Sequence, residues 1–158
     1  NALNSSVVIV DGDNNNFNVN QTGNAGINTM RLGQVGDFNI ATIEQSALPF
    51  ATNTANLTQV GTRNNVTMEQ YATVSGLGNQ VNLFQAGIDN DATLYQDGGN
   101  NNINAAQLGN NVDATLTQFG VDNNLSTLQA GDNLNLGITQ YGNTSMTIIQ
   151  TNFFTIGN

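Results

Sequence analysis

The chain alternates small or apolar residues with polar ones in a pattern that recurs about every 11 residues. In each repeat, the positions two and four before a recurring Gln are mostly apolar, as Leu94 and Ala92 are before Gln96, and the residues between are mostly polar. Alternation with a period of two is typical of a β-strand with one buried face. Each repeat therefore predicts a strand of about five to seven residues followed by a tight corner.

The recurring Gln defines what we call the ladder position of each repeat. Twelve of the 13 Gln residues occupy it, Gln80 does not, and Val10 takes its place in the first repeat. We expect the side-chain amides to stack and to bond to one another, which would satisfy a polar group at an inward position. The ladder residues are Gln21, Gln34, Gln45, Gln59, Gln70, Gln85, Gln96, Gln107, Gln118, Gln129, Gln140 and Gln150.

Asn and Gly mark the corners between repeats. Asn stands six residues before the ladder position in 10 of 13 repeats, and Gly stands two residues after it in 10 of 13. They bracket two loop residues, where the chain must reverse and a positive φ is expected. The corner Asn residues are Asn15, Asn28, Asn39, Asn53, Asn64, Asn79, Asn90, Asn101 and Asn123. The corner Gly residues are Gly23, Gly36, Gly61, Gly87, Gly98, Gly109, Gly120, Gly131 and Gly142.

The spacing of the ladder positions shows that the repeats are of two kinds. From Val10 the spacings are 11, 13, 11, 14, 11, 15, 11, 11, 11, 11, 11 and 10 residues, so only every second one varies. One corner is therefore invariant, and the other tolerates bulged loops near residues 24–27, 48–52 and 73–78. We expect one all-β domain over residues 1–158, an amyloid-like cross-β solenoid of about seven two-strand turns, with parallel strands in two facing sheets.

The two ends of such a solenoid are open strand edges. Soluble solenoids cap these edges with charges, Pro or a helix, and no such cap is evident here. Val8 and Val10 lie near one end, and Ile148 and Phe154 near the other. We expect these edges to form the interface for head-to-tail stacking of subunits into a fibre.

Two repeats match a known pattern at every defined position. Residues 34–45 read Gln-Val-Gly-Asp-Phe-Asn-Ile-Ala-Thr-Ile-Glu-Gln, and residues 85–96 follow the same Gln-x-Gly-x-x-Asn-x-Ala-x-x-x-Gln pattern. Over residues 4–150 the chain resembles the curlin-repeat family of bacterial curli subunits. The resemblance implies a secreted functional amyloid that polymerises outside the cell from an unfolded precursor and builds the biofilm matrix. It also implies a nucleator subunit and a dedicated secretion channel as partners. A major, fibre-building subunit is favoured over a nucleating one.

Composition excludes several classes of function. A net charge of −9 with only two basic residues argues against binding nucleic acid or an anionic membrane surface. The sequence has no Cys, and no apolar run approaches the ~18 residues of a membrane span. Residues 1–3 show no signal-peptide pattern, so an exported protein would be present in its mature form.

Acidic residues do not form a convincing catalytic or metal site. Asp11, Asp13 and Asn15 begin like a calcium loop, but Asn16 and Thr22 stand where that loop needs Gly and Glu. Glu44 and Glu69 are expected to point outward on adjacent turns, with no cleft or electrophilic partner nearby. We therefore expect no catalytic residues, no metal and no cofactor.

Aromatic residues suggest a possible contact surface. Tyr71, Phe119 and Tyr141 each follow a ladder Gln of the second kind and should line one outer face, with Asp97 between the first two. Such a row could contact ligands or neighbouring fibrils. The rival function is a monomeric solenoid that binds ice or carbohydrate on a Thr/Asn face. It needs a regular outward Thr row, which the residues just before these Gln do not form.

Overall fold

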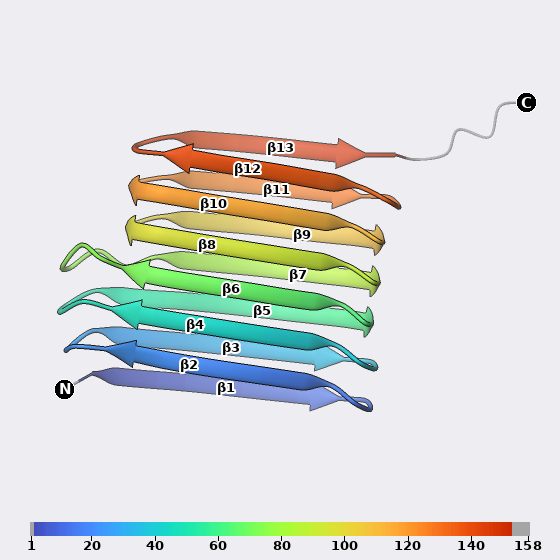
Figure 1. The fold of residues 1–158 in the computed structure, drawn as a ribbon, viewed down its shortest axis with the longest axis horizontal. Coiled ribbons are helices and arrows are strands. Elements are labelled where there is room, and N and C mark those ends of the chain that lie inside the picture. The colour runs from blue at the N-terminus through green and yellow to red at the C-terminus, as the bar shows by residue number, and fades with distance from the viewer. Residues whose placement is uncertain (1, 153–158) are drawn as a thin grey trace, which may run out of the picture.

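The computed structural model describes residues 2–152, and these form one flat stack of strands (Figure 1). The strands are β1 (Leu3–Asp11), β2 (Asn16–Gly23), β3 (Ile27–Val35), β4 (Ile40–Ala47), β5 (Thr52–Thr62), β6 (Asn65–Ala72), β7 (Gln80–Ile88), β8 (Asp91–Gly99), β9 (Asn102–Asn110), β10 (Asp113–Val121), β11 (Asn124–Ala130), β12 (Asn135–Tyr141) and β13 (Ser145–Thr151). Seven residues, as expected, make up β11, β12 and β13, but the other ten strands are longer, because pairing between turns continues past the ladder Gln toward the corner. β5, for example, has 11 residues.

The strands form two parallel sheets that face each other. The odd-numbered strands make a seven-stranded sheet, and the even-numbered strands make a six-stranded sheet. We call these the odd sheet and the even sheet. This arrangement confirms the predicted solenoid, with six two-strand turns and a thirteenth strand. Equivalent residues of successive repeats are paired directly, as Gln45 is with Gln70. Each position of the repeat therefore forms a column along the axis.

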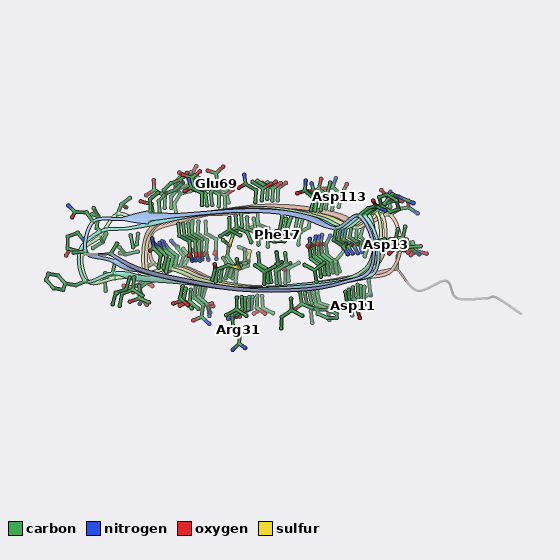
Figure 2. All side chains as sticks on the ribbon, turned by 90° about the horizontal axis from the view of Figure 1, so that it is seen from below. Asp11, Asp13, Phe17, Arg31, Glu69 and Asp113 are labelled. Atoms are coloured by element: carbon green, nitrogen blue, oxygen red, sulfur yellow. The ribbon has the colours of Figure 1, made fainter. Side chains whose placement is uncertain are left out.

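The core is a thin layer of apolar columns between the sheets (Figure 2). Its members occupy the positions two and four before the ladder position, as the alternation predicted. The buried cluster comprises Met30, Leu32, Ala41, Ile43, Ala55, Leu57, Val66, Met68, Val81, Leu83, Ala92, Leu94, Ile103, Ala105, Ala114, Leu116 and Leu125. Because apolar surface is buried in every turn, each turn depends on its neighbours for a complete core.

The connections on the two sides of the stack differ in length. Those that follow odd strands are short throughout. Measured between ladder positions, those that follow even strands are longer in the first half of the chain, and the connection between β6 and β7 is the longest (Figure 1). The longer loops also stack on one another, since Phe50 N–H donates to Ala25 O and Gly76 N–H to Pro49 O, both at 3.2 Å. In the described part of the chain, no helix is long and apolar enough to cross a membrane.

Candidate functional site

The ladder Gln side chains form two continuous hydrogen-bonded columns, one in each sheet. In the even sheet, Gln45 Nε2 donates to Gln70 Oε1 at 2.7 Å, and the column runs from Gln21 to Gln140. In the odd sheet it runs from Gln34 to Gln150. Gln45 Nε2 also donates to the backbone carbonyl of Thr29 in the facing sheet at 3.3 Å. The columns therefore satisfy buried amides and tie the two sheets together.

Each Gln column has a direction. In every Gln–Gln bond, Nε2 of the earlier residue donates to Oε1 of the later one. At the C-terminal end, Gln140 and Gln150 each donate one N–H to a facing carbonyl, and their second N–H has no acceptor among the described residues. At the N-terminal end, Gln21 Oε1 accepts no hydrogen bond from any described residue. One end of the even-sheet column thus offers a donor and the other an acceptor.

Val10 interrupts the column of the odd sheet. Val10 pairs with Gln34, and Gln34 Oε1 is buried without a hydrogen-bond partner among residues 2–152. An amide at position 10 would have supplied the missing donor, as Gln34 Nε2 does for Gln59 Oε1 at 2.8 Å. The sequence shows the substitution directly, but only the stacking reveals the unpaired oxygen that it leaves. The first turn is therefore less well satisfied than the turns that follow it.

Asn side chains form a second set of columns at the corners. Asn64 is fully buried, and its Nδ2 donates to Asn39 Oδ1 at 3.1 Å and to the backbone carbonyl of Gly87 at 3.1 Å. Asn90 Nδ2 in turn donates to Asn64 Oδ1 at 3.0 Å. These Asn bonds run from later to earlier turns, opposite to the Gln columns. They also satisfy backbone groups exposed by the reversal of the chain.

The corner Gly residues adopt backbone conformations that only Gly accepts readily. Gly36, Gly61, Gly87, Gly98, Gly109, Gly120, Gly131 and Gly142 all have positive φ. At Gly87, with φ of 135°, an added Cβ would also overlap the carbonyl oxygen of Gly109 in the next turn. Gly23 is the exception to the expected positive φ. Its loop is longer, and Ala25 takes the left-handed conformation there, with φ of 59°.

Among residues 2–152, nothing covers the apolar core at the two ends of the solenoid. Phe17 in β2 points between the sheets (Figure 2) yet is 46% exposed. Met146 takes the same position of the repeat in β13 of the other sheet and is 43% exposed. Of the expected edge residues, Val10 is also exposed, and Val8 and Ile148 are half-buried. Phe154 lies outside the described residues. No strand or helix of residues 2–152 covers either end.

Asn152 provides a small local cap that the sequence did not reveal. It stands where most repeats have the corner Gly, and its Oδ1 accepts a hydrogen bond from Asp132 N–H at 3.0 Å. Its Nδ2 donates to Asp132 O. The side chain thus takes the place of the next turn at one corner, while the core and the Gln columns beside it stay open.

Four aromatic rings form a continuous row on the outer surface of the even sheet. Ring centroids are 5.8 Å apart for Tyr71 and Tyr95, 5.4 Å for Tyr95 and Phe119, and 5.3 Å for Phe119 and Tyr141. Sequence reasoning placed three of these on one face but missed Tyr95, which precedes its ladder Gln instead of following it. Tyr95 closes the gap that Asp97 was expected to leave.

Carboxylates lie beside this row. Glu44 and Glu69 are opposite each other on adjacent strands, as expected, and Tyr71 O–H donates to Glu69 Oε2 at 3.3 Å. Partial burial and then the two Glu side chains raise the pKa of Tyr71 well above its ordinary value. Burial, Asp97 and Glu69 raise the pKa of Tyr95 in the same direction. Both phenols are therefore neutral hydrogen-bond donors at physiological pH.

Another row on the same face also escaped sequence reasoning. Thr42, Thr67, Thr93 and Thr115 are in register three residues before the ladder Gln. The residues directly before the ladder Gln are irregular, and they gave no sign of this Thr row two positions earlier. A flat binding face needs a second such row beside it, and there Glu44, Glu69 and Tyr95 interrupt the hydroxyls.

Charged groups elsewhere are dispersed. Asp13 N–H donates to Asp37 Oδ1 at 2.8 Å across two corners, and Arg63 pairs with Asp89 at 2.6 Å. Arg63 holds the pKa of Asp89 below its usual range through this hydrogen bond. Within residues 2–152, no group of three or more His, Cys, Asp or Glu side chains could hold a metal ion.

Comparison with known proteins supports the family resemblance. Residues 87–120, which span β8, β9 and most of β10, match the family model described as Curlin associated repeat. No curated protein and no solved structure matches the chain. The curlin repeat belongs to structural, non-enzymatic proteins that are components of extracellular curli fibres.

Proposed function

We propose that this chain is a structural subunit that polymerises head to tail into extracellular, curli-like amyloid fibres of a bacterial biofilm matrix. The observation that carries the proposal is the open core, because inward-facing Phe17 and Met146 remain about half exposed at opposite ends. Stacking of a second copy would bury these columns and extend both sheets. Fibres of this kind would serve adhesion and surface colonisation.

The hydrogen-bonding groups at the two ends support the same arrangement. Among residues 2–152, the C-terminal end presents amide N–H groups of Gln140 and Gln150 that have no acceptor, and the N-terminal end presents Gln21 Oε1. Joining unlike ends sets amide donors of one copy against an amide acceptor of the next, whereas joining like ends does not. An incoming unfolded chain would therefore add by templated pairing of its strands and amides. Growth by this route yields a polar fibre.

The same proposal includes partners outside the chain. A nucleator subunit and a dedicated secretion channel are expected from the family to which the repeat belongs. A ladder Gln in twelve of the thirteen repeats favours the major, fibre-building role for this subunit. A nucleating role would require the chain to start fibres of a different subunit, which is readily tested by mixing.

The first experiment follows assembly directly. Protein diluted from denaturant is monitored by thioflavin fluorescence and imaged by electron microscopy, with and without preformed seeds. We expect a lag, a rise and thin unbranched fibres, and a shorter lag when seeds are added. A soluble β-rich monomer that ignores seeds would contradict the proposal and favour the monomeric binding module.

A second experiment tests the role of the ladder ends. We expect Gln150→Leu to slow seeded elongation more than Gln85→Leu, because residue 150 is at the terminal turn that pairs with the next copy. Stability should change in the opposite order, since Gln85 bonds to amides on both sides and Gln150 on one. Elongation rates that simply follow the loss of stability would contradict a special role for the end.

A further inference from the structure

Two rings and two carboxylates form a checkerboard on the outer face of β6 and β8. Glu69 and Tyr71 point outward on β6, and Tyr95 and Asp97 point outward on β8. The register pairs Glu69 with Tyr95 and Tyr71 with Asp97, so each ring has a carboxylate beside it along and across the strands. The two rings lie on one diagonal with centroids 5.8 Å apart.

The carboxylates of this checkerboard keep capacity for a ligand. Glu69 accepts from the Tyr71 hydroxyl through Oε2, and Asp97 accepts from the Thr73 hydroxyl through Oδ1 at 2.9 Å. One oxygen of each carboxylate is used in these bonds, and the other oxygen makes no hydrogen bond with the described residues. A cation bound over this checkerboard would have two aromatic rings and two carboxylates as neighbours.

The charge of the whole face favours a cationic partner. The strands of the even sheet carry five carboxylates, at Glu44, Glu69, Asp91, Asp97 and Asp113, and no Lys or Arg. Arg31 lies on the opposite face, in the odd sheet, and Arg63 lies in a corner (Figure 2 labels Arg31 and, on the other side, Glu69 and Asp113). Two even-sheet faces would repel each other, so the face does not pair with the same face of a second copy.

We propose that the checkerboard of Glu69, Tyr71, Tyr95 and Asp97 is a docking site for arginine side chains of a basic partner polypeptide. A guanidinium group stacks on an aromatic ring through its plane and bonds to a carboxylate through its edge. The rings of Phe119 and Tyr141 extend the row along the axis for further arginines. Lysine, a strongly hydrated point charge, makes the ionic contact but not the planar one.

The site is separate from the ends that are proposed to carry polymerisation. It lies on the lateral surface, so it remains accessible whether the chain is a monomer or part of a fibre. Failure of one proposal therefore leaves the other standing. A chain that never polymerises but binds arginine peptides would contradict the fibre and support this site.

The test uses the full chain and a fluorescein-labelled peptide of alternating Arg and Gly, with a Lys–Gly peptide of equal length as the comparison. Affinity is measured by fluorescence anisotropy for soluble protein and by co-sedimentation for fibres. We expect the Arg peptide to bind at least about fivefold more tightly than the Lys peptide, because only guanidinium makes the planar contact. We expect Tyr95→Thr and Tyr71→Ser each to weaken Arg-peptide binding about fivefold or more.

The replacements and the control are matched to the fold. Thr117 and Ser46 occupy the same columns as Tyr95 and Tyr71 in neighbouring strands, so both substitutions suit the sheet. The control is Phe84→Thr, which removes a 40% exposed ring from the opposite face and should leave affinity unchanged. Glu69→Gln should reduce both the affinity and its salt dependence. Circular dichroism checks that each variant keeps its β-structure, and Tyr95→Leu replaces Tyr95→Thr if the latter does not fold.

Equal affinity for the Arg and Lys peptides, with no effect of removing either ring, would overturn the proposal. That result would mean that the peptides respond only to the overall negative charge. An equal loss on Phe84→Thr would also overturn it, because it would show that any exposed ring serves. Tight binding of Arg peptide that depends on both rings and on Glu69 would support it.

Discussion

The two sides of the solenoid reverse the chain under different constraints. From each odd strand to the even strand that follows it, as far as β11 and β12, the ladder spacing is 11 residues. At each of these corners the Gly and the residue two places after it both have positive φ, as Gly87 and Asp89 do. After even strands this geometry appears only in the second half of the chain. In the first half, Ala47 and Ala72 take the Gly position, and the connections are longer.

This difference shows that Gly is required by the tight corner and not by the repeat itself. Where the corner is tight, the backbone at this position has positive φ and approaches the carbonyl of the next turn closely. Where the loop is longer, the positive φ moves further along the chain, to Phe50 or Gly76, and a Cβ fits at the strand end. Loop length and the identity of one residue are thus linked through backbone geometry.

The largest effect is expected when Gly and Ala are exchanged between the tight corner and the longer loop. Gly87→Ala places a Cβ at a φ of 135° and against the carbonyl oxygen of Gly109. We expect it to lower the free energy of unfolding by about 3–5 kcal/mol, through backbone strain and overlap. The matched change Ala72→Gly should cost less, about 1–2 kcal/mol, from backbone entropy and the loss of a buried methyl group. Urea unfolding of soluble protein, followed by circular dichroism, measures both, and similar losses for the two variants would show that the corners are not distinct.

The next test concerns the corner amides. Asn64→Ala removes the donor to the carbonyls of Gly87 and Val60 and the acceptor for Asn90 N–H. We expect a loss of about 2–3 kcal/mol in the free energy of unfolding, because buried backbone groups lose their partners. Urea midpoints measure this loss.

The same column offers its own control at Val112, which is buried where earlier turns have Asn. Val112 N–H already donates to Asn90 Oδ1 at 3.0 Å. Val112→Asn would extend the amide column by one turn, and we expect a change within about 1 kcal/mol in either direction. A loss comparable to that of Asn64→Ala would show that the column depends on apolar packing at this turn.

The smallest effect is expected from the ion pair of the short corners. Arg63 and Asp89 are about half exposed, at 57% and 48%, so salt screens their attraction. Because the pKa of Asp89 is lowered in the folded state, its contribution is complete above the unfolded pKa of about 4 and disappears as the pH falls through the lower folded value. Asp89→Asn should therefore be slightly less stable than the parent at pH 7, and the difference should vanish in strong acid or high salt. A difference that persists at pH 2 would exclude the ion pair as its cause.

The sequence was sufficient to predict the repeat, the two strand types and the interior. The period of two identifies which side of each strand is buried, and the ladder spacing separates the two kinds of corner, because a solenoid repeats the same environment at each turn. The inward position of Gln45 and its stacking on Gln70 follow from that repetition alone. The continuation of the strands beyond Gln did not follow from the repetition, since strand pairing continues until the backbone turns away.

Contacts between residues at different positions of the repeat were determined by the tertiary structure. Tyr95 meets Tyr71 and Phe119 from the adjacent column because rings on neighbouring strands are within reach diagonally. The direction of the amide columns depends on the facing carbonyls that fix each amide, and the unpaired Gln34 Oε1 depends on what the turn below presents. The repeat period thus determined the stack and its core. The outer surface required the three-dimensional register, because its contacts join residues at different positions of the repeat. The two ends required it because each terminal turn lacks a neighbour on one side.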